Sequence, residues 1–116
     1  MAITEPYELD GVTVTATELS IVSGTTALQT VTTAGVYQLW VDASAMLKGD
    51  EYIVRIYEKV EATGGTKRVA MSWRLLGAQA TNFVTPSFIL INGWDMTLQK
   101  IAGTDRAFDA SIRRIG

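Results

Sequence analysis

Cysteine and histidine are both missing from this sequence of 116 residues. Without cysteine there are no disulfides and no thiol nucleophiles, and without either residue the usual ligands of zinc, haem and iron–sulfur clusters are gone. Histidine is also the commonest general acid or base of catalytic sites. We therefore expect a protein that is not an enzyme and that binds no cofactor and no metal ion.

Basic charge is scarce as well. Ten lysines and arginines stand against twelve acidic residues, which gives a formal net charge of −2. Adjacent basic residues occur only at Lys67-Arg68 and Arg113-Arg114. A surface that binds phosphate backbones needs a stripe of basic side chains. We therefore expect no nucleic acid among the partners.

Long apolar runs are absent too. A helix that spans a bilayer needs about 20 apolar residues, and no stretch of the sequence approaches that length. Residues Met1–Glu5 lack the positive region followed by an apolar run that marks a secretion signal. We expect a soluble chain that is made in the cytoplasm and has no contact with a membrane.

The sequence does contain enough apolar material for one core. Apolar residues make up 47% of it, and a domain of this size buries roughly two-thirds of the surface that its unfolded chain exposes. Ten glycines, only two prolines and many threonines suit pleated strands joined by tight turns, because threonine is stiff at χ1 and fits a half-buried pleat. The composition favours a single β-rich domain.

Eight segments between turn signals are predicted as strands, and the clearest of them alternate apolar and polar side chains with a period of two, which is the pattern of strands with one face on a core. They cover residues 12–22, 26–32, 36–41, 51–60, 68–75, 87–91, 94–101 and 107–115. The clearest of them, residues 51–60, places on one face Tyr52, Val54, Ile56 and Val60. Together they predict an all-β, single-domain antiparallel β-sandwich that is jelly-roll-like and has about eight strands.

Three links between these segments carry turn signals. Glycines within residues 62–66 predict a hairpin between the fourth and fifth strands, and Asn92-Gly93 predicts another between the sixth and seventh. Asp42 is expected to cap one short helical turn over residues 43–47, with Gly49 in the left-handed conformation behind it.

The beginning of the chain has a different pattern. Residues 1–9 show no alternation, whereas residues 10–116 contain all eight predicted strands. We interpret the first segment as an N-terminal arm and the second as the β-sandwich domain.

Three tryptophans, Trp40, Trp73 and Trp94, could stack on sugar rings or pack as ordinary hydrophobic groups. Trp73 alternates in phase with the apolar residues of its strand, which predicts a core position, and Trp40 is out of phase with its apolar neighbours. Aromatic rings bury a large area in cores and in protein interfaces. Core packing or a protein interface is therefore the favoured interpretation of all three.

Acidic residues gather near several predicted turns, at Asp42, Asp50, Glu51, Asp95, Asp105 and Asp109. Such oxygen donors could hold calcium if loops brought them together. No loop has the Asp-x-Asp-x-Asp-Gly spacing that identifies a calcium loop, so turn initiation and capping are favoured. Paired acids for glycoside hydrolysis would need a set separation across a cleft, which sequence spacing does not reveal.

Four segments combine glycine with aromatic or acidic residues, namely Gly35–Asp42, Gly49–Tyr52, Gly93–Met96 and Ala102–Arg106. With these segments the chain resembles small β-sandwich virion proteins of tailed bacteriophages, particularly the capsid cement or decoration proteins. The resemblance implies an accessory structural subunit, often a homo-oligomer in the form of a trimer, that binds the major capsid protein or other virion proteins. It would lie on the capsid surface and stabilise the shell.

Such a subunit acts through buried area, through an arm that pairs with a neighbour's sheet edge, and through many copies on one lattice. The residues expected to contact partners are Met1, Ile3, Pro6, Tyr7, Trp40 and Trp94. We expect no catalytic, cofactor-binding or metal-binding residue.

Two alternatives stay open. A carbohydrate-binding or adhesion module of a phage fibre or surface assembly would place two or more aromatic side chains in one shallow groove, drawn from Trp40, Tyr57, Trp73 and Trp94. Another virion component, such as a head–tail connector or a tail protein, would differ in ring symmetry and not in chemistry.

Overall fold

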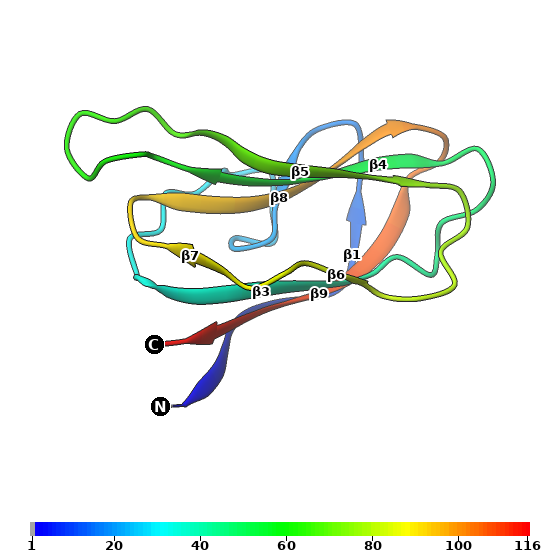
Figure 1. Cartoon of the computed structure of the whole chain (residues 1–116). Helices are drawn as coiled ribbons and strands as arrows, with labels where there is room; N and C mark the ends of the chain where they lie inside the picture. The colour runs from blue at the N-terminus through cyan, green and yellow to red at the C-terminus, as the bar shows by residue number, and fades with distance from the viewer. Residues whose placement is uncertain (1) are drawn as a thin grey trace.

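The computed structural model describes residues 2–116, and over this range the chain is all-β (Figure 1). The strands are β1 (Ile3–Val14), β2 (Leu19–Ser20), β3 (Gly35–Asp42), β4 (Glu51–Glu58), β5 (Arg68–Leu76), β6 (Phe83–Val84), β7 (Phe88–Leu90), β8 (Trp94–Ala102) and β9 (Arg106–Ile115). Sheet A has the order β1-β9-β3, with β6 and β7 both on the far side of β3, and sheet B has the order β2-β8-β4-β5. The predicted all-β architecture with antiparallel sheets is confirmed.

The short strands β6 and β7 pair with different parts of β3 and act as one interrupted strand. Pro86 lies between them, where a residue without an N–H interrupts a ladder at least cost. If the two are counted as one, the eight strands have the orders 1-8-3-6 and 2-7-4-5, which is the arrangement of a jelly roll.

The core lies between the sheets and is filled by alternate residues of each strand. In β3 the buried side chains are Tyr37, Leu39 and Val41, and in β4 they are Tyr52, Val54 and Ile56, as the period of two predicts. The predicted hairpin between β4 and β5 is also confirmed, since the two strands pair antiparallel along their length. Val60 differs from its prediction: it is 95% exposed, because β4 ends at Glu58 and the chain turns away.

The link at Asn92-Gly93 is not a hairpin turn, and here the prediction is wrong. β7 pairs with β3 in sheet A, whereas β8 lies between β2 and β4 in sheet B, so the link crosses from one sheet to the other. Gly93 has the expected positive φ of 72°. The N–H groups of Ile91 and Asn92 donate to the Glu58 carboxylate, which replaces the ladder bonds of a hairpin.

The segment predicted as one strand over residues 12–22 crosses between the sheets as well. β1 ends at Val14, and the chain enters sheet B only at Leu19. Val14 and Leu19 are both buried although they are five residues apart, so the period of two changes phase at this break. The chain bends at residues 16 and 17 between them, where the Thr17 N–H donates to Thr15 Oγ1 at 3.2 Å.

The predicted strand at residues 26–32 is absent. Leu28 is 47% exposed, and only Val31 makes an isolated bridge, to Trp94. Side chains take the place of a ladder here, because the Gln29 N–H donates to the Asp95 carboxylate at 2.8 Å. Nearby, the Ala27 N–H donates to Thr25 Oγ1 at 3.2 Å, and local bonds of this kind compete with strand pairing.

The short helical turn predicted after Asp42 does not form either. Two successive turns replace it, closed by Met46 N–H to Ala43 O and by Asp50 N–H to Leu47 O, each at 3.0 Å. Asp42 does accept the predicted local bond, from the Ser44 N–H at 2.9 Å. Hydrogen bonds from Ser44 also lower the pKa of Asp42.

The segment interpreted as an arm is part of sheet A over the residues described. Residues 3–9 form the first part of β1 and pair with β9, with Ile3 opposite Ile115. A bulge lies between Thr4 and Tyr7 and contains Pro6. Met1 lies outside the described residues.

In residues 2–116 there is also no helix with the length and apolar character needed to cross a membrane.

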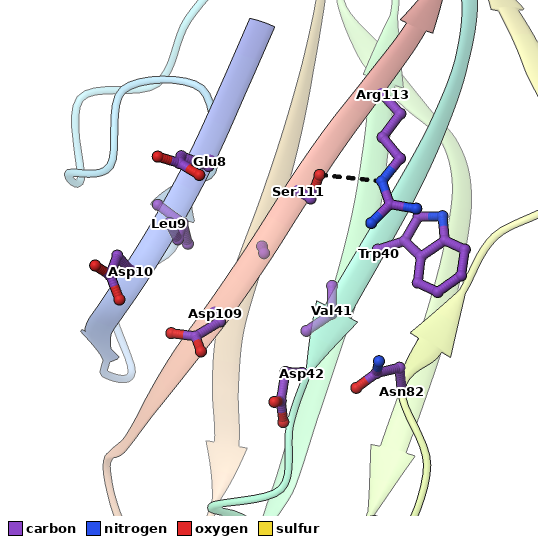
Figure 2. Close-up of a pocket in the computed structure, with 11 residues that line it drawn as sticks. Glu8, Leu9, Asp10, Trp40, Val41, Asp42, Asn82, Asp109, Ser111 and Arg113 are labelled. Carbon is purple, nitrogen blue, oxygen red and sulfur yellow. Dashed lines mark hydrogen bonds between the residues drawn. The ribbon is translucent and has the colours of Figure 1, made fainter. Parts of the chain in front are cut away.

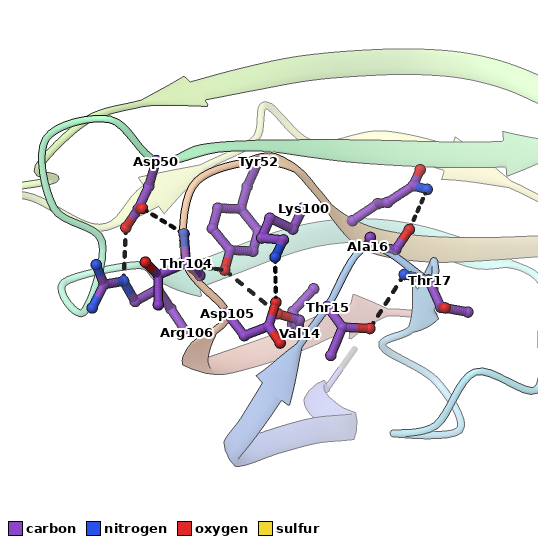
Figure 3. Close-up of polar contacts among 11 residues, drawn as sticks. Val14, Thr15, Ala16, Thr17, Asp50, Tyr52, Lys100, Thr104, Asp105 and Arg106 are labelled. Carbon is purple, nitrogen blue, oxygen red and sulfur yellow. Dashed lines mark hydrogen bonds and ion pairs between the residues drawn. The ribbon is translucent and has the colours of Figure 1, made fainter.

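Asp50 ties the β3–β4 link to the turn between β8 and β9 (Figure 3). Its buried carboxylate accepts bonds from Leu47 N–H at 2.9 Å, Thr104 N–H at 3.0 Å and Arg106 Nε at 2.7 Å. Gly103 packs directly against it with a φ of 92°, and a Cβ there would collide with the carboxylate. Glycine is therefore required at position 103.

This arrangement makes stability depend on acid pH. The Arg106 guanidinium, followed by the Leu47 and Thr104 amides, lowers the pKa of Asp50 from 3.8 to about 2. Because the folded state holds the proton less tightly than the unfolded state, this contribution to stability is complete above about pH 4 and disappears as the pH falls toward 2. We expect the urea midpoint of Asp50→Asn to depend less on pH in this window than that of the wild type. Equal slopes for the two proteins would contradict the assignment.

Candidate interaction surface

The outer face of sheet A carries a continuous row of apolar side chains. Ile115 of β9 lies directly opposite Ile3 of β1 on one side and Val36 of β3 on the other, and Val36 lies opposite Ile89 of β7. Residues directly opposite each other in a sheet share a face. The face is the outer one, because Tyr37, the next residue of β3, points into the core. We call Ile3, Ile115, Val36 and Ile89 the apolar row.

The apolar row is open to solvent at both ends, whereas Val36 and Ile115 between them are half-buried. Ile3 is 74% exposed, Ile89 is 70% exposed, and Ile91 just beyond β7 is 52% exposed. A hollow of about 510 Å³ lies between Val36, Ile89, Ile91 and Ile115. The solvated face of an antiparallel sheet is normally polar, and contiguous exposed apolar patches mark contact sites. The row is therefore well suited to bind another protein.

Both ends of the described chain lie beside the row. Figure 1 shows the start of β1 and the end of β9 together at one corner, in agreement with their register. Arg114 holds this corner, because its Nε donates to Ala34 O at 3.0 Å. A Cβ on Gly35 would lie 2.8 Å from the same Nε, so glycine permits the close approach.

Farther along sheet A the outer face becomes polar around Trp40 (Figure 2). The Arg113 guanidinium lies 4.1 Å from the centroid of the Trp40 ring, and its Nε donates to Ser111 Oγ at 3.3 Å. The ring N–H of Trp40 donates to Gln38 Oε1 at 2.9 Å. Trp40 is half-buried, and both its N–H and one ring face are occupied within the chain.

Beyond Trp40 the same face is acidic. Asp42 of β3 lies directly opposite Asp109 of β9, and Glu8 and Asp10 of β1 line the same hollow of about 290 Å³. The pKa of Glu8 is raised by a hydrogen bond shared with Glu5 and by repulsion from nearby carboxylates. The outer face of sheet A therefore changes from apolar at the chain ends to acidic at the opposite end.

The residues predicted to contact partners fall in different places. Ile3 belongs to the apolar row, and Pro6 is exposed near it. Tyr7 is half-buried, with its ring centroid 6.2 Å from that of Trp94. Trp94 itself is fully buried, because β8 runs through the middle of sheet B and position 94 faces the core. Contrary to its prediction, Trp94 has no surface to offer a partner.

Sequence reasoning missed most of the apolar row, namely Val36, Ile89 and Ile115. One signal was available in the run from Phe88 to Ile91, which is apolar at every position. A strand with one solvated face should alternate, so an unbroken apolar run on a short strand indicates that both faces are covered.

The four aromatic residues of the carbohydrate-binding alternative do not share a groove. Trp94 is in the core, and Trp73 packs across the sandwich on Phe83 with ring centroids 5.4 Å apart. Trp40 lies on the outer face of sheet A. Tyr57 belongs to sheet B, where its hydroxyl donates to Glu18 Oε2 at 2.7 Å, and burial raises its pKa to about 12.

The acidic residues considered as ligands have separate structural roles. Asp95 is buried, Asp105 pairs with Lys100 at 2.6 Å, and Glu51 pairs with Arg74. Asp42 and Asp50 hold the β3–β4 link, and Asp109 accepts the Gly11 N–H at 2.7 Å. Over residues 2–116 no three acidic side chains converge on a position that could hold a metal ion.

Neither a protein-family model nor a curated protein sequence matches the chain. Among solved structures, the disulfide-linked pili of Bacillus endospore appendages are 17% identical, with 97% of this chain and 88% of that chain covered and a TM-score of 0.49. The CBM22-1–GH10 modules of Clostridium thermocellum xylanase 10B, complexed with xylohexaose, are 13% identical over 73% of this chain and 17% of that chain, with a TM-score of 0.44. The structure of infectious bursal disease virus, Gx strain, is 15% identical over 97% of this chain and 30% of that chain, with a TM-score of 0.38. These similarities assign the chain to no family.

Proposed function

We propose that this chain is a structural subunit of a virion, a capsid cement or decoration protein that binds the major capsid protein and stabilises the shell. The observation that carries the proposal is the apolar row on the outer face of sheet A. The proposed place of action is the capsid surface, after synthesis in the host cytoplasm, and the proposed state is a homo-oligomer, a trimer. The proposal includes no catalytic step.

The physical basis is burial of the row against a neighbouring chain. Covering an isoleucine side chain completely is worth about 1.5–3 kcal/mol, and Ile3, Ile89 and Ile91 all have more than half of their area free. Many equivalent sites on one lattice multiply this gain, because each copy bound holds several subunits together. A modest contact per copy is therefore sufficient to strengthen a shell.

The test is to add the purified chain back to particles from the source of the sequence whose gene for the chain has been deleted. We expect the wild type to bind and to raise the temperature at which the particles open. Ile89→Lys/Ile91→Lys should weaken binding at least about tenfold, because each lysine places a charge where an apolar contact is made.

Val60→Lys is the matched control. Val60 is even more exposed, but it lies two residues beyond the end of β4, at the start of the β4–β5 link and outside the apolar row. The control should bind as the wild type does. Absence of the chain from particles of its source, or equal binding by the double variant, would refute the proposal.

A further inference from the structure

Sheet edges form a second kind of surface, and they differ in how well they are protected. β2 has two residues, and β6 and β7 are short and interrupted at Pro86, which closes these edges to regular pairing. β1 with 12 residues and β5 with 9 residues are long edge strands on the free sides of sheets A and B. An uncovered edge of this length can add a strand from another chain.

The two long edges carry opposite charges. β1 contains Glu5, Glu8 and Asp10 and no basic residue, whereas β5 contains Arg68 and Arg74, the latter paired with Glu51 of β4, and no acidic residue. All five side chains are exposed. At about 3.3 Å per residue, the charged stretches are about 17 Å and about 20 Å long, so they match in length.

Proline and bulges commonly protect an edge strand, and β1 has both. β1 has two bulges, one between Thr4 and Tyr7 that contains Pro6 and one between Leu9 and Val12 that contains Asp10, so residues 7–9 and 12–14 are the parts with a regular partner in β9 beyond Thr4. The missing N–H of Pro6 therefore removes no position from the regular parts of the strand. The charges of β1 and β5 are then the features that decide which strand can pair with them.

We propose that β1 of one copy pairs edge to edge with β5 of a second copy of this chain. The inference rests on the proposed role as a subunit of an assembly. Opposite charges on paired strands stabilise the pair and like charges destabilise it. β1 against β1 would bring carboxylates together, and β5 against β5 would bring guanidinium groups together. The charges disfavour both symmetric pairings and favour β1 with β5.

The position of the two strands makes this contact heterologous. β1 ends sheet A on one side, and β5 ends sheet B on the other, where Trp73 of β5 packs on Phe83 of β6. The pairing therefore joins sheet B of one copy to sheet A of the next and leaves a free edge at each end. Repetition of such a contact produces a closed ring or a filament.

The test compares four full-length proteins by sedimentation velocity over a concentration series. They are the wild type, Arg68→Glu/Arg74→Glu, Glu8→Arg/Asp10→Arg, and the variant that combines all four changes. We expect the wild type to associate and each single-edge variant to associate at least about tenfold more weakly. The combined variant should recover association, because its edges are again complementary, and it has the same net charge as the wild type.

Hydrogen exchange provides a second readout. Amides of β5 in the wild type and in the combined variant should become more protected as concentration rises, and those of the single-edge variants should not. A wild type that stays monomeric, or a combined variant no better than the single-edge variants, would overturn the inference. If the single-edge variants associate as the wild type does, whereas Ile89→Lys/Ile91→Lys does not associate, the edge pairing is overturned and the proposed function stays intact. Edge-dependent association without particle binding would refute the proposed function alone.

Discussion

Trp94→Ala is expected to lower the free energy of unfolding by about 3–5 kcal/mol. Trp94 is the largest fully buried side chain. Its ring centroid lies 4.6 Å from that of Tyr37, and its Nε1 donates to Thr33 O at 3.2 Å. Truncation leaves a cavity between the sheets and removes one of the two hydrogen bonds that Thr33 O accepts, while the bond from the Tyr37 hydroxyl at 2.7 Å remains. Because small domains have only about 5–15 kcal/mol of stability, the loss should be evident in urea unfolding.

Trp40→Ala is the matched control, since it removes the same side chain from the outer face of sheet A. We expect it to cost about 1–2 kcal/mol, because Trp40 is half-buried and loses one cation–π contact and one hydrogen bond to Gln38. If Trp94→Ala unfolds the chain entirely, Trp94→Phe keeps most of the ring and should fall between the two. Equal losses for Trp94→Ala and Trp40→Ala would contradict the burial assigned to Trp94.

Asp95→Asn is expected to cost about 2 kcal/mol, although it changes shape very little. Asp95 is fully buried, and its carboxylate accepts bonds from Ser20 Oγ at 2.7 Å, Met96 N–H at 2.8 Å and Gln29 N–H at 2.8 Å. Asparagine has one acceptor oxygen, so its NH₂ group must face a donor in either orientation. A buried donor left unsatisfied costs about 1–3 kcal/mol.

The measurement is urea unfolding combined with hydrogen exchange at Gln29, whose amide should exchange faster in the variant. Asp105→Asn is the control, because Asp105 forms an exposed pair with Lys100, which is worth less than about 1 kcal/mol. Unchanged exchange at Gln29 would show that Asp95 does not hold the link between β2 and β3. Burial raises the pKa of Asp95, so this group opposes the acid sensitivity that Asp50 confers.

The sequence was sufficient to predict the strands whose register is set within one sheet. Alternation in β3 and β4 follows from a core on one side and solvent on the other, and this pattern is local. The links that change sheets were not predictable in the same way. Asn92-Gly93 has the residues of a hairpin turn, but the N–H groups of Ile91 and Asn92 donate to the Glu58 carboxylate, which is distant in the sequence.

The interaction surface was less visible in the sequence. Ile3 was named from its place near the chain start, but the apolar row exists only because β9 brings Ile115 between Ile3 and Val36. Cross-strand neighbours of this kind depend on strand order, which alternation does not reveal. The error for Trp94 is the opposite one. It was predicted to contact a partner, but this large aromatic residue beside a turn lies in the core.

Hydroxyl-radical footprinting of the apolar row tests the central claim most directly. The side chains of Ile89 and Ile91 would be labelled in the dilute isolated chain and in the particles of its source. We predict strong labelling of both in the isolated chain and marked protection in the particles, because a neighbouring protein covers the row. Equal labelling in the two samples would contradict the claim that this face is where the chain binds its partners.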